Sequence, residues 1–466
     1  VLFRSPGTSN AHVEDGPGDV GRLSFSGNRE NNLGVGASLI QSWGYVGASI
    51  SQIDKLYGIR GHHSSKIDLM QDRFDIDSLI RSPFAGFDSI RFKLGQTEYR
   101  HTELEDGTDP HIRFTNRALE SRVELAHQAI AGWRGRFGLQ TDGSTVQALD
   151  LHDAGESTVP RTRSSSTAAF IVEETDIGDV RLNAGARLEQ VSRRPVDAAQ
   201  RNFNLGSASF GALWRFTPGY GLGSTVSLAQ RAPTPEELYS AGPHHPTETY
   251  DKGTSSLGKE TSQNIDLSLQ KTEDKLRWKA NVFQNKVSNF IYGRLGEDVC
   301  ADTGLAPSGG TCASLGLGEA LRTRTFSQNN ATLRGYEVEV SYNLHEYGWF
   351  GRAYADDSRG TLDNLGYLPL QPVMRVGTTV GYQDANWRSS LSILNASSQT
   401  RIANANVSNE TTTRGYTRID ANISWRQRIG ENELTWFASA RNLLNEEIRL
   451  STSLLKDYVP QPGRNF

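Results

Sequence analysis

The chain has 466 residues and a formal net charge of −4, with lysines and arginines scattered rather than clustered. Nucleic-acid binding needs a basic surface, so this composition argues against a nucleic-acid partner. No run of about 18 apolar residues occurs, which excludes a membrane-spanning helix but not a membrane barrel, because barrel strands show only alternating hydrophobicity. The 46 glycines and 2 methionines fit one large β architecture as well as several globular domains.

The chain begins at Val1 without the charged and apolar regions of a signal peptide. We interpret residues 1–20 as a terminal scar or disordered segment, and residues 21–466 as one domain that is incomplete at both ends. The final Asn465 and Phe466 are expected to begin a further strand.

Alternation of apolar and polar residues is the main structural signal. From Val180 to Glu189 apolar side chains occupy every second position, and the pattern recurs in 336–342, 418–426 and 434–440. Strands of a β-sandwich usually run about five or six residues, whereas crossing a bilayer at a tilt needs about ten. The pattern predicts an all-β, transmembrane antiparallel β-barrel. Its predicted lipid-facing residues include Val180, Leu182, Trp278, Ile419, Trp425, Leu434 and Trp436.

Connection lengths support the same architecture. Short links are expected at 42–44, 82–84, 129–132, 176–178, 217–220, 272–274, 345–347, 384–385 and 429–431, with one long polar link between each consecutive pair. Tight periplasmic turns alternating with long extracellular loops are typical of outer-membrane barrels. The count predicts about eighteen strands. A large secreted β-protein with decorated loops is the alternative.

Cys300 and Cys312, the two cysteines of the chain, lie in the long link between Gly296 and Glu319. Two cysteines in one extracellular loop predict a disulfide, which requires an oxidising compartment and would restrain the loop.

The stretch from Arg231 reads RAPTPEELY and is followed by Gly242-Pro243-His244, Thr249-Tyr250-Asp251 and Glu260. This order resembles the signature of TonB-dependent outer-membrane receptors. Further matching segments occur at 45–47, 57–62, 289–292, 335–337, 441–445 and 460–466, so the resemblance covers almost the whole chain. The sequence departs from the family at 254–260, where receptors usually carry asparagine-proline before the leucine and proline before the glutamate.

The resemblance implies a barrel of twenty-two strands around an N-terminal plug, in the outer membrane of a Gram-negative bacterium. The chain is then a fragment of such a barrel, without the plug, roughly three early strands and most of the last strand. Expected partners are outer-membrane lipid, the TonB energy-transducing complex through the missing plug, and a metal or metal-chelate ligand. No cofactor is expected.

The ligand expectation depends on histidines in or beside the extracellular links. Four groups pair imidazoles with each other or with carboxylates, which suits zinc and other borderline metals. The candidate ligand-binding residues are His62, His63, His101, His152, Asp153, His244, His245 and Glu248. Of these, His62, His63, His244 and His245 are the predicted metal ligands. The alternative is that polar loops collect such residues because they face water.

The motifs Tyr57-Gly58-Ile59 and Gly242-Pro243-His244 resemble those of the zinc-receptor branch of the family. We therefore expect a receptor that imports zinc or a metal complex, with the loop 231–260 reaching over the barrel mouth. A ferric-siderophore or other organic-ligand receptor and a passive porin are the alternatives. An enzyme is not expected. Ser240 with His244 or His245 is the nearest approach to the Ser-His pair of an outer-membrane phospholipase, and nothing resembles a nucleophile elbow or a phosphate-binding glycine loop.

Overall fold

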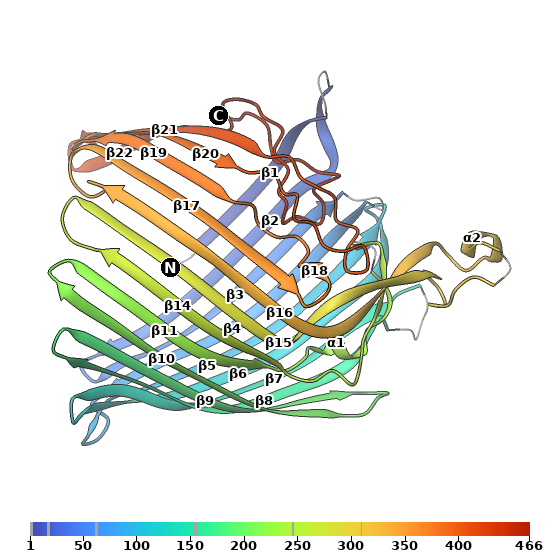
Figure 1. Cartoon of the computed structure of the whole chain (residues 1–466), viewed down its shortest axis with the longest axis horizontal. Coiled ribbons are helices and arrows are strands. Elements are labelled where there is room, and N and C mark those ends of the chain that lie inside the picture. The colour runs from blue at the N-terminus through green and yellow to red at the C-terminus, as the bar shows by residue number, and fades with distance from the viewer. Residues whose placement is uncertain (1–2, 16–18, 61–63, 153–156, 245–246, 309) are drawn as a thin grey trace.

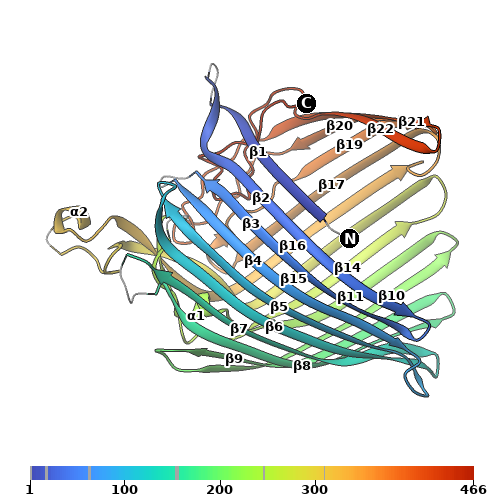
Figure 2. The same cartoon turned by 180° about the vertical axis from the view of Figure 1, so that it is seen from behind.

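The computed structural model describes residues 3–15, 19–60, 64–152, 157–244, 247–308 and 310–466. Nearly all of this chain is strand, and the strands run obliquely across one curved sheet (Figures 1 and 2). The first strands are β1 (Phe3–Asp15), β2 (Asp19–Gln41), β3 (Gly44–Ile59), β4 (Ser65–Arg81), β5 (Phe87–Glu105), β6 (Asp109–Ile130), β7 (Trp133–Asp150), β8 (Val159–Ile177), β9 (Val180–Pro195), β10 (Arg201–Thr217) and β11 (Tyr220–Arg231).

Two short helices interrupt the second half of the chain, and none of the described helices is long and apolar enough to cross a membrane. The elements after β11 are α1 (Pro235–Tyr239), β12 (Ala241–His244), β13 (Thr249–Lys252), β14 (Glu260–Lys271), β15 (Leu276–Cys300), α2 (Cys312–Leu315), β16 (Ala320–Tyr342), β17 (Gly348–Leu362), β18 (Gly366–Tyr367), β19 (Arg375–Gln383), β20 (Trp387–Ala396), β21 (Tyr416–Ile429) and β22 (Asn432–Ala440).

The sheet is an antiparallel meander. Each strand from β1 to β11 pairs with the next, β11 pairs with β14, β17 pairs with β19, and β19 to β22 continue the order. Three short strands stand outside the meander: β12 and β13 form a hairpin whose β13 pairs in parallel with β16, and β18 pairs with the end of β17. The predicted fold class, an all-β antiparallel barrel fold, is confirmed.

Tight turns lie at one end of the sheet and long segments at the other, as Figure 1 shows with α1 and α2 both at the long-segment end. One tight turn requires Gly44, whose φ is +145° and whose position would put a Cβ against the carbonyl oxygen of Leu79. All eight tryptophans lie within five residues of a tight turn: Trp43, Trp133, Trp214, Trp278, Trp349, Trp387, Trp425 and Trp436. An aromatic girdle of this kind marks a membrane interface.

The outward face of the sheet is apolar, although it is exposed in the isolated chain. Leu188 is 71% exposed, and Phe210 and Trp214 on the neighbouring strand are 47% and 49% exposed. The residues that the sequence assigns to lipid lie on this face: Trp436 is 55% exposed and pairs with Trp425, whereas Val180 pairs with Trp214. Exposed apolar side chains over a whole face are stable only against another apolar phase, here lipid.

Buried apolar clusters lie where the long segments pack against the sheet of long strands, which we call the wall. One joins α1 and the following loop to β9 and β10, a second joins β15, β16 and β17 to the segment 397–415, and a third lies between β6, β7 and β8. Several strands exceed the roughly ten residues that cross a bilayer, since β15 has 25 residues and β16 has 23. Their outer ends extend as hairpins beyond the length that a bilayer requires.

Candidate functional site

Two imidazoles stack on each other at the outer end of β6 and β7. The rings of His111 and His152 have centroids 4.9 Å apart and planes inclined by 17°. Antiparallel pairing accounts for this contact, because Ile112 pairs with Asp150 and the amide of Leu151 donates to the carbonyl of His111. The turn between β5 and β6 then brings further residues to the same place.

Three carboxylates surround the stacked pair. His111 Nδ1 lies 2.9 Å from Glu105 Oε2 and His111 Nε2 lies 3.7 Å from Asp150 Oδ2, while His152 Nε2 lies 3.4 Å from Asp109 Oδ2. We call these five residues the mouth cluster. They offer nitrogen and oxygen donors suited to zinc. Among the described residues, no three side chains of this type are already arranged around one metal position, so a bound ion would have to draw them together.

Below the mouth cluster, β5 carries two further titratable groups at His101 and Glu103. The His101 ring stacks on Phe114 at 4.4 Å and its Nδ1 lies 2.8 Å from the hydroxyl of Tyr99. Burial lowers the pKa of His101 to about 4, so this imidazole is neutral at pH 7. Burial raises the pKa of Glu103 to about 7, against the opposing effect of a charge on His111. Both side chains are held within the wall beneath the mouth cluster.

The loop 231–260 is folded against the wall. Thr234 caps α1, and Arg231 holds that helix to β14 by ion pairs of 2.9 Å to Glu237 and 2.6 Å to Glu260. Leu238 and Leu257 are buried with residues of β9 and β10 in the first apolar cluster. Tertiary packing and ion pairs therefore hold this loop in place.

Two predicted ligands in this loop have partners within the protein. His244 Nδ1 lies 2.6 Å from the hydroxyl of Thr247, and the hydroxyl of Tyr458 donates to Glu248 at 3.0 Å. The second contact joins the loop to the C-terminal segment across the mouth. Neither residue belongs to the mouth cluster.

The structure thus brings one predicted ligand, His152, together with His111, which is not among the predicted ligands. The predicted residues His62, His63, Asp153 and His245 lie outside the described residues. The Asp106-Gly107 pair between two strand-like segments is a hairpin signal that could have placed Glu105 beside His111.

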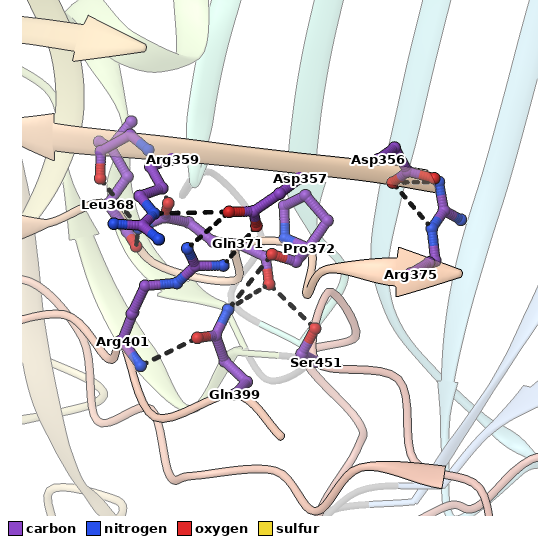
Figure 3. A network of polar contacts seen from close by, with 11 residues as sticks. Asp356, Asp357, Arg359, Leu368, Gln371, Pro372, Arg375, Gln399, Arg401 and Ser451 are labelled. Carbon is purple, nitrogen blue, oxygen red and sulfur yellow. Dashed lines mark hydrogen bonds and ion pairs between the residues drawn. The ribbon is translucent and has the colours of Figure 1, made fainter. Parts of the chain in front are cut away.

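A polar network ties three outer segments together near the end of β17 (Figure 3). Arg401 donates to both oxygens of Asp357, at 2.8 and 3.2 Å. The amide nitrogen of Gln399, whose side chain is buried, donates to the carbonyl of Gln371, which also accepts from the hydroxyl of Ser451. These bonds fix the segment 397–415 and the C-terminal segment against the wall.

The hairpin of β15 and β16 extends farthest from the sheet and carries α2 at its tip (Figures 1 and 2). Cys300 and Cys312 are joined by a disulfide and both side chains are buried. The disulfide ties the start of α2 to the end of β15.

Comparison with known proteins gives the same architecture. The family model described as "TonB dependent receptor-like, beta-barrel" matches residues 4–443. The structure titled "Copper transporter OprC" superposes with a TM-score of 0.80 at 16% identity, over 98% of this chain and 73% of that chain. The FrpB iron transporter from Neisseria meningitidis (F3-3 variant) gives 0.75 at 12% identity, over 99% and 74%.

The hemophore receptor HasR of Serratia marcescens, in a complex with its hemophore HasA and heme, gives a TM-score of 0.75 at 13% identity, over 99% of this chain and 74% of that chain. Such low identities establish the fold and leave the ligand of this chain open. The family match covers most of the sequence and agrees with the meander, the turn rhythm and the apolar outer face. The chain belongs to the TonB-dependent receptor-like β-barrel family.

Proposed function

We propose that this chain forms the barrel of an outer-membrane receptor that captures a scarce divalent metal ion, with zinc favoured, or a complex of that metal, and imports it to the periplasm. Proteins of this family are Gram-negative outer-membrane receptors rather than enzymes. The observation that carries the metal proposal is the mouth cluster, in which His111 and His152 stack at 4.9 Å among three carboxylates.

The chemistry required is binding and release, without a covalent step. Two neutral imidazoles and one or two carboxylates complete the coordination of zinc. The carboxylates also orient the imidazoles before the ion arrives. In this proposal the ion is held at the mouth and then carried inward by TonB-driven rearrangement of a plug domain. Protons compete with zinc for imidazole nitrogen, so capture weakens in acid.

The test is a zinc titration of the full receptor beside a His111→Ala/His152→Ala variant. We expect the double variant to bind zinc at least tenfold more weakly, which corresponds to about 1.4 kcal/mol. His127→Ala is the matched control, because His127 also faces a carboxylate, Glu173 at 2.9 Å, but lies at the tight-turn end. That control should bind zinc as the unmodified receptor does.

His244→Ala/His245→Ala and His62→Ala/His63→Ala variants test the ligand pairs that the sequence indicates. If neither of these variants nor the mouth-cluster variant changes zinc affinity by more than about twofold, roughly 0.4 kcal/mol, the metal proposal fails. An organic ligand, such as a ferric siderophore held by aromatic and arginine side chains, then becomes the better proposal. Uptake that persists after the proton gradient is collapsed would instead favour a passive porin.

A further inference from the structure

A row of arginines crosses four neighbouring strands on the outward face of the sheet. Arg117 on β6 pairs with Thr145 on β7, Thr145 pairs with Arg163 on β8, and Arg163 pairs with Arg194 on β9. Directly paired residues lie side by side on one face, and neighbouring strands are about 4.8 Å apart. All three arginines are exposed, and the Arg117 side chain is 74% exposed even though it contacts Glu98.

The row lies directly above the lipid-facing surface. Arg117 has the same orientation as Leu119, which is 51% exposed, and as the other odd-numbered positions down to the tight turn after Ile130. Thirteen positions separate Arg117 from Ile130, and at about 3.3 Å per residue and a tilt of about 45° they span about 30 Å. The hydrocarbon core of a bilayer is about 30 Å thick. The row therefore lies at the level of the outer headgroups.

An apolar groove of about 660 Å³ lies on the same strands below the row. Its lining includes Val123, Leu125, Phe137, Leu139, Ala169, Ile171 and Leu188. Between the groove and the arginines, Ser121 donates to or accepts from Thr141 at 2.9 Å, and Thr167 and Gln190 continue that rung across β8 and β9. The next rung toward the row pairs Leu119 and Gly143 with Ser165 and Ser192, and the arginines follow it. The outward face thus becomes more polar from the groove toward the row, as a lipid does from its acyl chains to its headgroup.

Further arginines lie on the same part of the outer surface. Arg100, Arg113 and Arg161 lie exposed on the same face beyond the row. Among the residues that the structure describes, Arg161 and Arg163 have no carboxylate within ion-pair distance, and Arg194 is hydrogen-bonded to the neutral Gln200 at 2.9 Å. Within the row, Arg163 and Arg194 are therefore available for an anion, whereas Arg117 contacts Glu98 at 3.1 Å. The planar fork of a guanidinium group matches phosphate.

We propose that Arg117, Arg163 and Arg194 bind the phosphate groups of a phosphorylated glycolipid in the outer leaflet of the membrane, with an acyl chain of that lipid in the groove below. Charge complementarity and the matching height of groove and row support this occupant. The inference depends on the membrane orientation of the family and not on the identity of the imported ligand.

The experiment titrates bisphosphorylated lipid A into the full chain in detergent and measures bound lipid by native mass spectrometry. We expect an Arg117→Gln/Arg163→Gln/Arg194→Gln variant to bind lipid A at least tenfold more weakly. Lipid A stripped of both phosphates should bind the unmodified chain with the same loss, and the triple variant should not distinguish the two lipids. Higher salt should weaken only the phosphate-dependent binding.

A matched control removes the same charge from the opposite end of the sheet. The variant Arg134→Gln/Arg215→Gln/Arg428→Gln alters three exposed arginines near tight turns and should bind lipid A within twofold of the unmodified chain. Circular dichroism establishes that both triple variants retain the sheet. Equal binding of phosphorylated and stripped lipid A, or unchanged binding by the Arg117 variant, overturns the proposal. Equal losses in the two triple variants also overturn it, because they show a general effect of charge.

Discussion

At the scale of single residues, burial shifts the pKa values of two neighbouring side chains at the outer end of β5 in opposite directions. His101 and Glu103 are two positions apart and so lie on the same face of the strand. Burial disfavours the charged form of each, which lowers the pKa of His101 to about 4 and raises the pKa of Glu103 to about 7. At pH 7, His101 is therefore neutral, whereas Glu103 changes its charge close to neutral pH.

The two pKa shifts make the stability of the folded state depend on pH in opposite directions. Stability from keeping His101 neutral is complete above its unfolded pKa of about 6.5 and is lost as pH falls through 4. Stability from keeping Glu103 protonated is complete below its unfolded pKa of about 4.5 and is lost as pH rises through 7. The two losses fall in different pH windows and can be measured separately.

We predict that Glu103→Gln stabilises the outer hairpin of β5 and β6 at pH 8 but not at pH 4.5, because glutamine cannot acquire the charge that burial penalises. Hydrogen exchange of residues 99–115 should be slower in the variant than in the unmodified chain at pH 8 and equal at pH 4.5. Equal exchange at both pH values would show that Glu103 titrates as an exposed carboxyl.

At the scale of elements, the segments beyond the wall are folded units held by different means. The loop with α1 has a capping box, a set of ion pairs around Arg231 and a share of an apolar cluster. The segment with α2 has the Cys300–Cys312 disulfide, and only the cysteine side chain is buried in that helix. The second segment should therefore depend more strongly on its covalent link.

We predict that Cys300→Ser/Cys312→Ser loosens the segment from Cys300 to Ala320 and leaves the barrel strands unchanged. Closing a loop of about fifteen residues stabilises a folded state by roughly 3 kcal/mol, so local opening should become far more frequent. Limited proteolysis should cut the variant within 301–319 and leave the loop 231–260 intact. Resistance of the variant equal to that of the disulfide-linked chain would contradict this prediction.

At the scale of the whole molecule, the two ends of the sheet have different surfaces. The tight-turn end carries all eight tryptophans, whereas the other end carries the mouth cluster, the polar network and the arginine row. An apolar face between two such ends fixes how deeply the sheet sits in a bilayer. The short turns of outer-membrane barrels are periplasmic, so the opposite end, with the mouth cluster, faces the outside.

We predict that tryptophan fluorescence of the full chain in lipid bilayers reports one interface. Spin labels placed at the headgroup level should quench the emission more strongly than labels placed at the bilayer centre, because indole rings reside at the headgroup boundary. Trp214→Phe should lower the intensity without changing this depth profile. Stronger quenching from the bilayer centre would place the tryptophans away from the interface and would contradict the proposed depth.

The sequence by itself determined the properties that repeat along the chain. Period-two alternation from Val180 to Glu189 and the rhythm of short and long links predicted an antiparallel membrane barrel, because each depends only on neighbouring residues. The ordered motif around Arg231 indicated the family for the same reason. Two cysteines in one link leave a single intramolecular pairing to consider.

Only the tertiary structure decided which distant residues meet. His111 and His152 are 41 positions apart, and the pairing of Ile112 with Asp150 places them together. Arg117, Arg163 and Arg194 form a row for the same reason, since a register shift by one position would turn each of them to the other face. Glu248 meets Tyr458 through packing across the mouth. Strand register and loop packing depend on contacts between remote segments, which the alternation of one sequence does not encode.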